Sequence, residues 1–335
     1  MSLGVAIIGC GLIGRKRAAT LGDARLVACA DLDRARAEAL ARTTNGAVAT
    51  DDWRAAIDAA NVDIVAVATT NDGLAEIARA ALDAGRHVIV EKPAARSVAE
   101  IEPLVDAARR ARRLVRVGFN HRYHPALRKA RELFEAGRLG DLMFVRGRYG
   151  HGGRVGYDKE WRADPARSGG GELIDQGVHL IDLSRWFLGE FAIVEGFAHT
   201  YYWEMPVDDN AFMLLRTPRD QTAFLHVSCT EWKNLFSFEI YGRHGKLQVE
   251  GLGGSYGVER LTFFEMLPEM GPPDTTIWEY PRGDQSWSLE FTEFVEDITL
   301  GREPSAGLAD ARAVLSVVEA IHGRSGYPRP AAALR

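Results

Sequence analysis

The chain has 335 residues, of which 46% are hydrophobic and 26% charged, and its formal net charge is −5 at pH 7. This length is sufficient for two domains with separate cores. The slightly acidic balance argues against a nucleic-acid-binding surface, which is normally basic, and no apolar run approaches the roughly 18 residues of a membrane-spanning helix. We therefore expect neither nucleic-acid nor membrane partners. The three cysteines form no paired or CxxC pattern, which favours a cytoplasmic protein.

The first recognisable feature is a glycine-rich turn between a strand and a helix. Residues 5–8 form a short apolar run without a basic leader, so a strand is expected there rather than a signal peptide. The turn Gly9-Cys10-Gly11-Leu12-Ile13-Gly14 follows, and a helix is expected over residues 15–21. In this fingerprint the first glycine makes the turn, the second lets a pyrophosphate approach the backbone, and the third lets helix and strand pack closely. The N-terminus of the helix would then face the phosphates.

An acidic residue follows this turn at the spacing that a dinucleotide site requires. The second strand, residues 26–30, ends at Asp31, twenty residues after the second glycine. Asp31 is expected to accept hydrogen bonds from the adenosine ribose and to repel a 2′-phosphate, which favours NAD(H). NADP(H) stays open, because Arg34 could shield a 2′-phosphate. Asp33 is interpreted as the N-cap of a helix over residues 34–42.

Further alternating strands and helices extend the same parallel sheet. Strands are expected at 62–68, 88–90 and 114–118, and helices at 74–84 and 97–112. In open sheets of this kind, ligands bind outside the carboxyl ends of the strands. The polar residues that follow predicted strand ends, and that we therefore assign to a cofactor site, are Asp31, Thr69, Thr70, Asn71, Glu91, Lys92 and Asn120.

One of these strand ends carries a lysine of special interest. The strand at 88–90 stops at Glu91-Lys92-Pro93, since proline has no N–H to give to the ladder. The chain strongly prefers Arg to Lys, so a Lys here suggests a use for a compact ammonium with a tunable pKa. The alternative is an ordinary strand-end lysine paired with Glu91, and the sequence leaves both interpretations open.

The second half of the chain changes its period toward two, as in an antiparallel sheet. A linking helix at 126–136 precedes it, and helices at 287–300 and 308–322 close the chain. Strands are expected at 142–148, 193–202, 211–216, 222–230, 237–241 and 246–250. The expected fold is α/β plus α+β. It has a dinucleotide-binding Rossmann domain over 1–120 and a substrate and oligomerisation domain with a large, mostly antiparallel open sheet over 121–335. A last helix at about 306–323 packs back on the first domain.

Three glycines introduce a polar helix inside this second half. The segment Ser168-Gly169-Gly170-Gly171 lets something approach the backbone closely. After it, Asp175, His179 and Asp182 are spaced i, i+4 and i+7, on one face of a helix. A histidine beside carboxylates can act as a general base near neutral pH. The alternative, a hydrogen-bonded core histidine, is opposed by the glycines and the flanking carboxylates.

A zinc site built from histidines and a carboxylate is another alternative. The candidate ligands are His121, His124, His151, Asp175 and His179. Their spacing matches neither a closed structural site nor an HExxH-type site, and no cysteine lies near them in the sequence. We therefore predict that the protein holds no metal.

Taken together, these residues resemble the glucose–fructose oxidoreductase, inositol dehydrogenase and rhizopine-catabolism family, Gfo/Idh/MocA, across nearly the whole chain. The combination of Glu-Lys-Pro with an Asp-x-x-x-His helix is fairly specific. The matching pieces are Gly9-Cys10-Gly11-Leu12-Ile13-Gly14, Glu91-Lys92-Pro93, Gly118-Phe119-Asn120-His121-Arg122-Tyr123, Trp161-Arg162, and Gly169-Gly170-Gly171 through Asp175 to His179 and Asp182.

The resemblance implies a catalytic set of Lys92, Asp175 and His179. His179 would take the proton of a sugar or cyclitol hydroxyl while hydride passes to the nicotinamide, Lys92 would hydrogen-bond the developing alkoxide, and Asp175 would orient substrate and His179. It also implies a cis Lys92-Pro93 bond, Trp161-Arg162 near the nicotinamide, and a homodimer or homotetramer through the C-terminal sheet. The residues expected to contact substrate are Lys92, Asn120, Arg122, Tyr157, Asp175 and His179.

The sequence departs from the family pattern in two places. Where many relatives have Thr-Pro-Asn-x-x-His, this chain has Thr69-Thr70-Asn71-Asp72-Gly73-Leu74, which puts one cofactor contact in doubt. The loop at 150–157 matches nothing in the family pattern and is expected to shape substrate choice. Two other functions stay open: an enzyme that recycles tightly bound NAD during hydrolysis or epimerisation, and a non-catalytic regulator that senses NAD and sugar.

Overall fold

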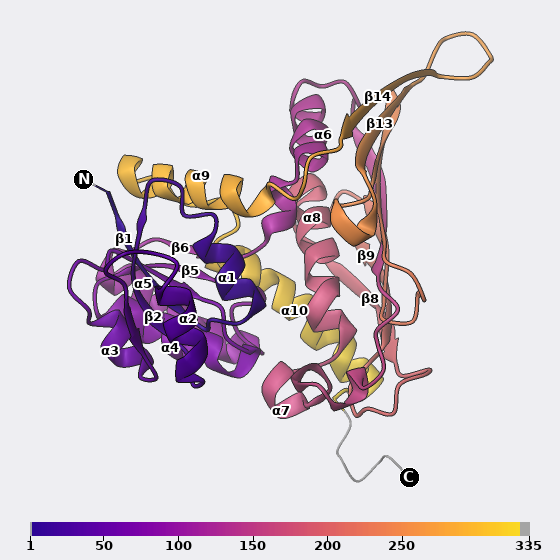
Figure 1. Cartoon of the computed structure of the whole chain (residues 1–335). Coiled ribbons are helices and arrows are strands. Elements are labelled where there is room, and N and C mark those ends of the chain that lie inside the picture. Colours follow the sequence, from indigo (N-terminus) through magenta and orange to yellow (C-terminus); the bar gives the residue numbers. More distant parts are fainter. Residues whose placement is uncertain (1, 329–335) are drawn as a thin grey trace. The chain divides into compact units, whose positions relative to one another are not determined.

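The computed structural model describes residues 2–328. The chain divides into two compact units, Met1–Phe119 with Trp287–Leu315 and Asn120–Ser286 with Ser316–Arg335. The predicted division into 1–120 and 121–335 stays a prediction, and the units differ from it in that Trp287–Leu315 groups with the N-terminal part of the chain. Each unit is described by itself below and is coloured along the sequence in Figure 1.

The first unit contains a six-stranded parallel sheet with strand order β3-β2-β1-β4-β5-β6. The central strands read as continuous apolar runs because both faces of the sheet are covered. The strands are β1 Gly4–Ile8, β2 Arg25–Ala30, β3 Val48–Thr50, β4 Ile64–Val67, β5 His87–Val90 and β6 Val115–Val117.

Helices connect these strands and cover the sheet. They are α1 Leu12–Ala18, α2 Arg34–Ala41, α3 Trp53–Ile57, α4 Asn71–Asp83, α5 Val98–Ala111 and α9 Ser286–Leu300. The predicted cap of α2 is confirmed, because the Asp33 carboxylate accepts a hydrogen bond from Ala35 N. Helix α9 packs Phe291 and Phe294 into the core formed by β1 and β4.

The second unit is built on an eight-stranded sheet with strand order β14-β13-β12-β11-β7-β10-β9-β8. Neighbouring strands run antiparallel except for β7 and β10, which pair in parallel. The strands are β7 Leu142–Gly150, β8 Ile193–His199, β9 Asn210–Arg216, β10 Thr222–Ser228, β11 Leu235–Gly242, β12 Gly245–Glu250, β13 Glu259–Glu265 and β14 Asp274–Tyr280. The mixed fold class predicted from the sequence is thereby confirmed.

Helices lie against one face of this sheet, with α6 on β12, β13 and β14 and α8 on β7 and β10 (Figure 1). The helical elements are η1 Asn120–Tyr123, α6 Pro125–Glu135, η2 Tyr157–Lys159, η3 Trp161–Ala163, α7 Pro165–Ser168, a π-helix Leu173–Gly177, α8 Val178–Leu188, η5 Gly254–Tyr256 and α10 Leu308–Ser325. Helix α10 contributes residues to both units.

Several elements differ from the sequence prediction. Helix α1 begins at Leu12 rather than at residue 15, because Gly11 is already its N-cap. The short elements β3 and α3 were not predicted, and neither was the hairpin β13–β14, which extends from the sheet in Figure 1. The segment after the three glycines starts as a π-helix rather than an α-helix, which is a geometry that sequence periodicity does not reveal.

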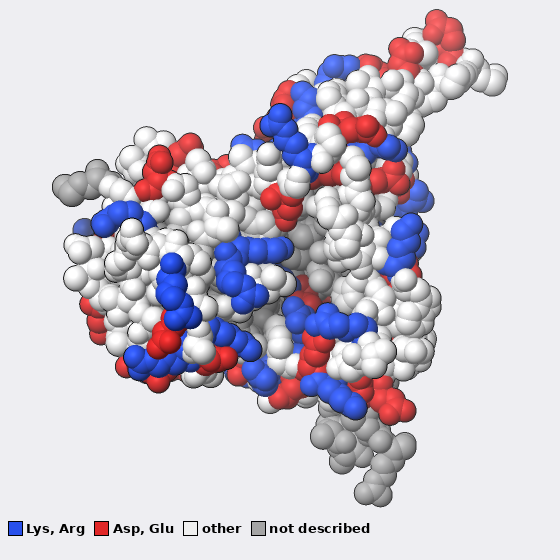
Figure 2. Space-filling model, in the orientation of Figure 1, with Lys and Arg blue, Asp and Glu red and all other residues white. Residues whose placement is uncertain are grey.

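No helix within residues 2–328 has both the length and the apolar character needed to cross a membrane. The face of the molecule shown in Figure 2 carries Lys and Arg side chains interspersed with Asp and Glu side chains. This mixture agrees with the small net charge of −5.

Candidate functional site

The glycine-rich turn of the first unit has the geometry of a backbone cradle. Gly9 has a φ of 93°, in the region that favours glycine. A Cβ on Gly14 would lie 1.9 Å from the Gly9 carbonyl oxygen, so Gly14 is required for the contact between α1 and the turn. A Cβ on Gly11 would meet nothing within 4 Å, so this position leaves open space beside the helix N-terminus.

Asp31 lies directly after β2, and both of its carboxylate oxygens already accept backbone hydrogen bonds. Oδ2 accepts from Cys10 N at 2.7 Å, and Oδ1 accepts from Asp33 N at 2.9 Å. A carboxylate offers about four acceptor positions, so about two are left for other donors. Arg34 pairs instead with Glu38 at 3.1 Å, in an exposed i, i+4 ion pair.

The residues after β4 form the start of α4. Thr70 is the N-cap, although its side chain makes no capping hydrogen bond and instead donates to Asp72 Oδ1 at 2.5 Å. Thr69 is partly buried and Asn71 is buried in the first turn. These predicted cofactor residues therefore lie at the carboxyl-end edge of the sheet, on which Asp31 and Glu91 also follow strand ends.

Glu91, the first residue after β5, is engaged by a buried arginine of α1. Its Oε1 accepts a hydrogen bond from Arg17 Nε at 2.8 Å. Arg17 also pairs with Glu290 of α9, which is fully buried. A Cβ on Gly118 would lie 2.9 Å from a guanidinium nitrogen of Arg17, so the glycine after β6 makes room for this network.

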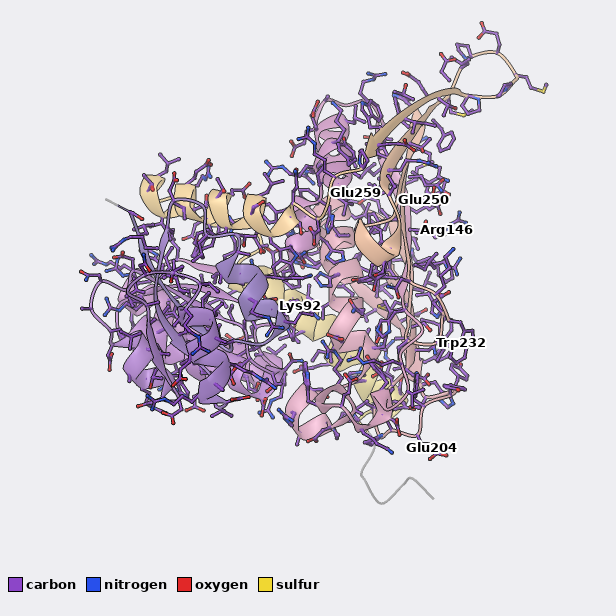
Figure 3. The ribbon with its side chains drawn as sticks, viewed as in Figure 1. Lys92, Arg146, Glu204, Trp232, Glu250 and Glu259 are labelled. Carbon is purple, nitrogen blue, oxygen red and sulfur yellow. The ribbon has the colours of Figure 1, made fainter. Side chains whose placement is uncertain are left out.

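Lys92 follows Glu91 and is labelled in Figure 3. The bond between Lys92 and Pro93 is cis, which confirms the prediction made from the family resemblance. The sequence left open an ion pair between Glu91 and Lys92. In the structure, the Glu91 carboxylate is bound by Arg17.

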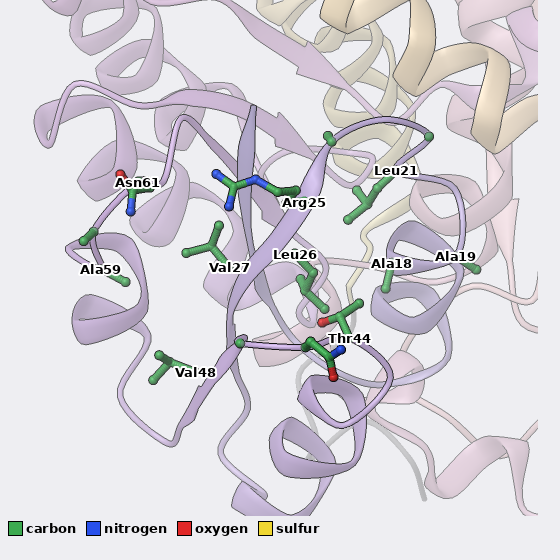
Figure 4. Close-up of a pocket in the computed structure, with 15 residues that line it drawn as sticks. Ala18, Ala19, Leu21, Arg25, Leu26, Val27, Thr44, Val48, Ala59 and Asn61 are labelled. Atoms are coloured by element: carbon green, nitrogen blue, oxygen red, sulfur yellow. The ribbon is translucent and has the colours of Figure 1, made fainter. Parts of the chain in front are cut away.

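The first unit also contains a hollow of about 590 Å³, shown in Figure 4. Its lining comes from the segments that precede or begin β2, β3 and β4, including Arg25, Asn45 and Asn61. Because these are the amino ends of parallel strands, the hollow lies at the edge of the sheet opposite to Asp31 and Glu91. It contains none of the predicted site residues.

In the second unit, Asp175 lies in the π-helix and is held by an arginine of η3. Arg162 Nε donates a hydrogen bond to Asp175 Oδ2 at 2.9 Å. The charge of Asp175 raises the pKa of Arg162, although burial opposes this shift. Both residues were predicted site residues, but their pairing was not predicted. The pair fixes the direction in which the carboxylate points.

His179 lies at the start of α8 and is almost completely buried. Its imidazole stacks on that of His121, with ring centroids 3.8 Å apart and an interplanar angle of 24°. His121 Nδ1 lies 3.2 Å from Asn120 Oδ1, and Asn120 Nδ2 donates to Ser286 Oγ at 2.8 Å. Asn120 and His121 therefore support the ring of His179 from one side.

The third polar residue of this helix, Asp182, forms a buried ion pair. Arg122 Nε and Nη2 donate to its two oxygens at 2.8 and 2.6 Å, in a bidentate arrangement. Arg122 is thus occupied by Asp182 and ties η1 to α8. Removing either partner would leave an uncompensated buried charge.

A buried glutamate that the sequence prediction omitted lies one turn before Asp175. Glu172 Oε1 is 3.6 Å from His151 Nε2. Gly153 N donates to His151 Nδ1 at 3.0 Å, so a neutral His151 carries its proton on Nε2, which faces Glu172. Burial lowers the pKa of His151, and the charge of Asp175 opposes this shift. His151 also contacts the ring of Tyr157 edge-on, with centroids 5.4 Å apart.

Tyrosines surround this group of carboxylates. Burial raises the pKa of Tyr149 and Tyr157 well above the usual value, and the negative charges of Glu172 and Asp175 add to the shift. Burial also raises the pKa of Tyr256, which hydrogen-bonds Tyr149, to about 12. These phenols stay protonated near neutral pH and can act as hydrogen-bond donors.

The metal-ligand alternative finds no geometric support among residues 2–328, where no three His, Cys, Asp or Glu side chains are placed to hold an ion together. His124, one candidate ligand, instead lies 3.0 Å from Glu259, which is labelled in Figure 3 and also accepts from Ala126 N at 2.5 Å. His121 packs between His124 and His179 as an aromatic ring.

The site residues that the sequence singled out thus form two groups, one in each unit. Glu172, Tyr149 and Tyr256 were missed. A signal for Glu172 was present, since it directly follows Gly171 and precedes Asp175 by three residues, on the same helix face. Tyr149 and Tyr256 lie far apart in the sequence and left no such signal.

The first unit has a parallel sheet with a glycine-rich turn, and the second has a helix that carries Asp175 and His179. These features define a protein with a dinucleotide-binding domain and a second domain. Family models agree: residues 3–119 match the oxidoreductase family with an NAD-binding Rossmann fold, and residues 127–248 match the GFO/IDH/MocA C-terminal domain. The chain belongs to the Gfo/Idh/MocA family of oxidoreductases, as the resemblance predicted, and its first unit has the NAD-binding fold of that family.

Two curated relatives are similar over part of the chain. Levoglucosan dehydrogenase of Pseudarthrobacter phenanthrenivorans is 35% identical over 180 residues, which cover 51% of this chain and 44% of the relative. Inositol 2-dehydrogenase 2 of Saccharopolyspora erythraea is 34% identical over 205 residues, which cover 60% and 58%. The chain therefore spans about half the length of these relatives in the matched regions.

A solved structure agrees over nearly the whole fold. Levoglucosan dehydrogenase in complex with NADH and levoglucosan superposes with a TM-score of 0.87 at 25% identity, covering 98% of both chains. This chain therefore shares its fold with that enzyme, whose solved structure contains NADH.

The residues of the first unit fit NAD on their own geometry. Gly11 leaves open space beside the N-terminus of α1, where a pyrophosphate could approach backbone N–H groups. Asp31 has acceptor positions left for ribose hydroxyls and carries the charge that would repel a 2′-phosphate. The Arg34 guanidinium pairs with Glu38, which reduces its availability to a 2′-phosphate.

Proposed function

We propose that the protein is an NAD(H)-dependent dehydrogenase that oxidises a secondary hydroxyl of a sugar, sugar derivative or cyclitol, or reduces the corresponding ketone. The observation that carries the proposal is that a chain of this family keeps an amine, a carboxylate and an imidazole at Lys92, Asp175 and His179. The names of two similar proteins, a levoglucosan dehydrogenase and an inositol 2-dehydrogenase, support the choice of substrate class.

His179 is the general base for alcohol oxidation and the general acid for the reverse reaction. Its imidazole accepts the hydroxyl proton, and a positioned base of this kind typically contributes about 10²- to 10⁴-fold to the rate. Stacking on His121 supports the ring orientation that this transfer needs. Asp175, held by Arg162, orients the substrate hydroxyl and His179.

Lys92 donates a hydrogen bond to the oxygen that becomes negative as its proton leaves. A fixed ammonium lowers the energy of that developing charge. Further substrate contacts are assigned to Asn120, Arg122 and Tyr157. Arg122 acts mainly through the position of η1, because its guanidinium is bound to Asp182.

The cofactor is held by residues of the glycine turn and of the strand ends, and the nicotinamide supplies the two-electron acceptor. The residues assigned to its binding are Gly9, Gly11, Leu12, Ile13, Gly14, Asp31, Arg34, Thr69, Thr70, Asn71, Glu91, Lys92, Asn120, Trp161 and Arg162. NAD is preferred to NADP because of Asp31. We also propose a cytoplasmic protein, since the three cysteines are free and buried. The family resemblance is the ground for proposing a homodimer or homotetramer formed through the open sheet.

The direct test is a dehydrogenase screen of the purified chain with NAD and NADP against sugars, sugar acids, inositols and nucleotide sugars. For the substrate that turns over, His179→Ala is expected to lower kcat at least about 100-fold while the Kd for NAD changes little. His244→Ala, at an exposed turn between β11 and β12, is the matched control and should keep full activity. A His179→Ala protein as active as its parent would refute the assignment.

Two other outcomes would replace the proposal. NAD that copurifies with the protein, combined with product formation but no net NADH, would indicate a cofactor recycled within each turnover. Binding of NAD and sugar without turnover across the whole panel would indicate a regulator.

A further inference from the structure

The glycines before the π-helix are explained by contacts within the second unit. A Cβ on Gly171 would lie 1.9 Å from the carbonyl oxygen of Asp208, and a Cβ on Gly170 would lie 2.5 Å from Cε1 of His322. Gly169 has a φ of 80° at the end of α7. The close approach that the sequence predicted at this segment is therefore made by Asp208 and His322.

Asp208 binds the backbone at the start of the π-helix with three hydrogen bonds. Its Oδ1 accepts from Gly171 N at 3.1 Å and its Oδ2 accepts from Leu173 N at 2.8 Å. Its main-chain carbonyl accepts from Glu172 N at 2.9 Å. Three consecutive N–H groups at a helix start, which otherwise lack partners inside the helix, are satisfied by this one residue. The negative charge at this end also complements the helix dipole.

The Asp208 carboxylate is in turn held by the last part of α10. His322 Nε2 lies 2.8 Å from Asp208 Oδ1 and, facing a carboxylate, acts as the donor. Asp208 is 0% exposed and His322 5% exposed, so solvent cannot easily replace either partner. Loss of the His322 donor would leave the capping carboxylate without one of its three polar contacts in a buried site.

The cap is connected to Asp175 by short backbone steps. Asp175 N donates to Gly171 O at 3.0 Å, so the residue that Asp208 binds also holds the backbone of Asp175. His179 follows four residues later on the continuous helical segment formed by the π-helix and α8. A displacement of residues 171–173 would therefore be transmitted to both side chains. In enzymes a misplacement of about 1 Å can cost on the order of 10²-fold in rate.

We propose that Asp208 and His322 are positioning residues, which orient Asp175 and His179 by capping the π-helix, and that the C-terminal helix α10 thereby sets the geometry of the reactive helix. This inference rests on the catalytic roles given above to Asp175 and His179. Neither Asp208 nor His322 is assigned a contact with substrate or cofactor.

The test compares two substitutions of His322 that differ in one hydrogen-bond donor. His322→Gln keeps a side-chain N–H that can reach Asp208 Oδ1, whereas His322→Leu has none. We expect His322→Leu to lower kcat by about 10-fold or more, whereas the Kd for NAD stays within about twofold. His322→Gln should restore most of the activity. Should the leucine variant fail to fold, His322→Phe keeps a planar ring against Gly170 and still lacks the donor.

Tyr327→Phe provides the matched control from the same end of the chain. The Tyr327 hydroxyl accepts from Thr200 N at 2.8 Å and so ties the segment after α10 to β8, without contacting residues 171–173. This variant loses the hydroxyl that contacts both Thr200 N and Thr200 Oγ1, in a partly buried part of the same C-terminal segment, and its kcat should stay near that of the parent. Equal losses in His322→Leu and Tyr327→Phe, or no rescue by glutamine, would overturn the proposal in favour of a general stabilising role.

Two readouts do not depend on turnover. Amide hydrogen exchange of residues 171–175 should be at least about 10-fold faster in His322→Leu than in His322→Gln, because only the former weakens the cap. The imidazole NMR signals of His179, assigned by their loss in His179→Ala, should shift in His322→Leu only. If the parent has no activity, the proposed function fails, and these two measurements still decide whether the cap orients His179. Unchanged signals in His322→Leu would refute it.

Discussion

Arg162 donates through Nε to Asp175 Oδ2 at 2.9 Å and so joins η3 to the π-helix. The pair lies within the second unit, and the Arg162 side chain is 34% exposed, so water screens part of the attraction. What the pair mainly provides is direction, since the guanidinium fixes Oδ2 of Asp175 and with it the orientation of the carboxylate.

We therefore expect Arg162→Gln to lower kcat/KM by roughly 10- to 100-fold, which is the loss expected for one hydrogen bond to a charged group. Arg162→Lys should fall between this variant and the parent, because an ammonium keeps the charge but not the fork of donors. The exposed Arg167 of α7 offers the control, and Arg167→Gln should leave kcat/KM unchanged. Steady-state kinetics on the substrate found in the screen would measure kcat/KM of all three variants. If kcat/KM of Arg162→Gln equals that of the parent, this pair does not orient Asp175 for catalysis.

The parts of the fold that could be predicted from the sequence are those with local causes. The glycine turn, the strand that ends at Asp31 and the Asp33 cap all depend on residues close together in the chain, so composition and spacing reveal them. Helix α8 was predicted for the same reason. Its π-helical start was not predicted, and the backbone N–H of its first residue is bound by Asp208, which is distant in the sequence.

The unpredicted part of the candidate site consists of partners far apart in sequence. Arg122 and Asp182 are 60 residues apart, Arg17 and Glu290 are 273 apart, and Asp208 and His322 are 114 apart. Each of these is a polar residue in the sequence, but no periodicity indicates which partner it will meet. The three glycines illustrate this limit, since a close approach was predicted and its partner could not be.

Cofactor preference is expected to depend on Asp31. In Asp31→Asn the side chain keeps its size but loses the charge that would repel a 2′-phosphate and one acceptor for the ribose. The KM for NAD should rise by about 10-fold, equivalent to one hydrogen bond of about 1.4 kcal/mol, and the ratio of NADP to NAD activity should rise with it.

Asp33→Asn tests whether this effect is specific. Asp33 is a neighbouring acid whose carboxylate accepts from Ala35 N as the cap of α2, and asparagine is an equally good cap. The ratio of NADP to NAD activity in Asp33→Asn should match that of the parent. A ratio that moves equally in both variants would point to the general charge of this edge rather than to Asp31.

Acid stability is expected to reflect His87 at the start of β5. Its Nδ1 accepts a hydrogen bond from Leu114 N at 3.1 Å, which only an unprotonated Nδ1 can do. Burial, together with the charge of Arg113, lowers the pKa of His87 to about 4. The unfolded chain, with a pKa near 6.5, therefore binds this proton first as the pH falls. The stability that comes from neutral His87 is fully present above pH 6.5 and is lost as the pH falls from there toward 4.

His87→Asn keeps an acceptor near the position of Nδ1 and removes the titration. Urea unfolding at several pH values between 7.5 and 4.5 should show that the difference in free energy of unfolding, parent minus variant, decreases as the pH falls. A difference that stays constant or increases would contradict the assignment of His87 as a neutral ring.

The buried network of Arg17, Glu91 and Glu290 is expected to control the stability of the first unit. One guanidinium binds two carboxylates in a largely buried site, and the charge of Arg116 also acts on Glu290. Burial raises the pKa of Glu290, whereas the pKa of Arg17, which burial alone would lower, is raised by Glu290 and Glu91. Arg17 thus stays charged, and it is the residue on which both carboxylates depend.

Arg17→Met should lower the free energy of unfolding by about 3–5 kcal/mol, because two buried carboxylates then lose the guanidinium that binds both of them. The loss should be smaller at pH 5 than at pH 7.5, because burial raises the pKa of Glu290 and its protonation removes that buried charge. Arg54→Met breaks an exposed pair with Glu76 and should cost less than about 1 kcal/mol at either pH. Urea unfolding of the three proteins would measure these effects. If Arg17→Met lowers the free energy of unfolding no more than Arg54→Met does, water reaches the carboxylates when the guanidinium is absent. In that case Arg17 contributes packing rather than charge.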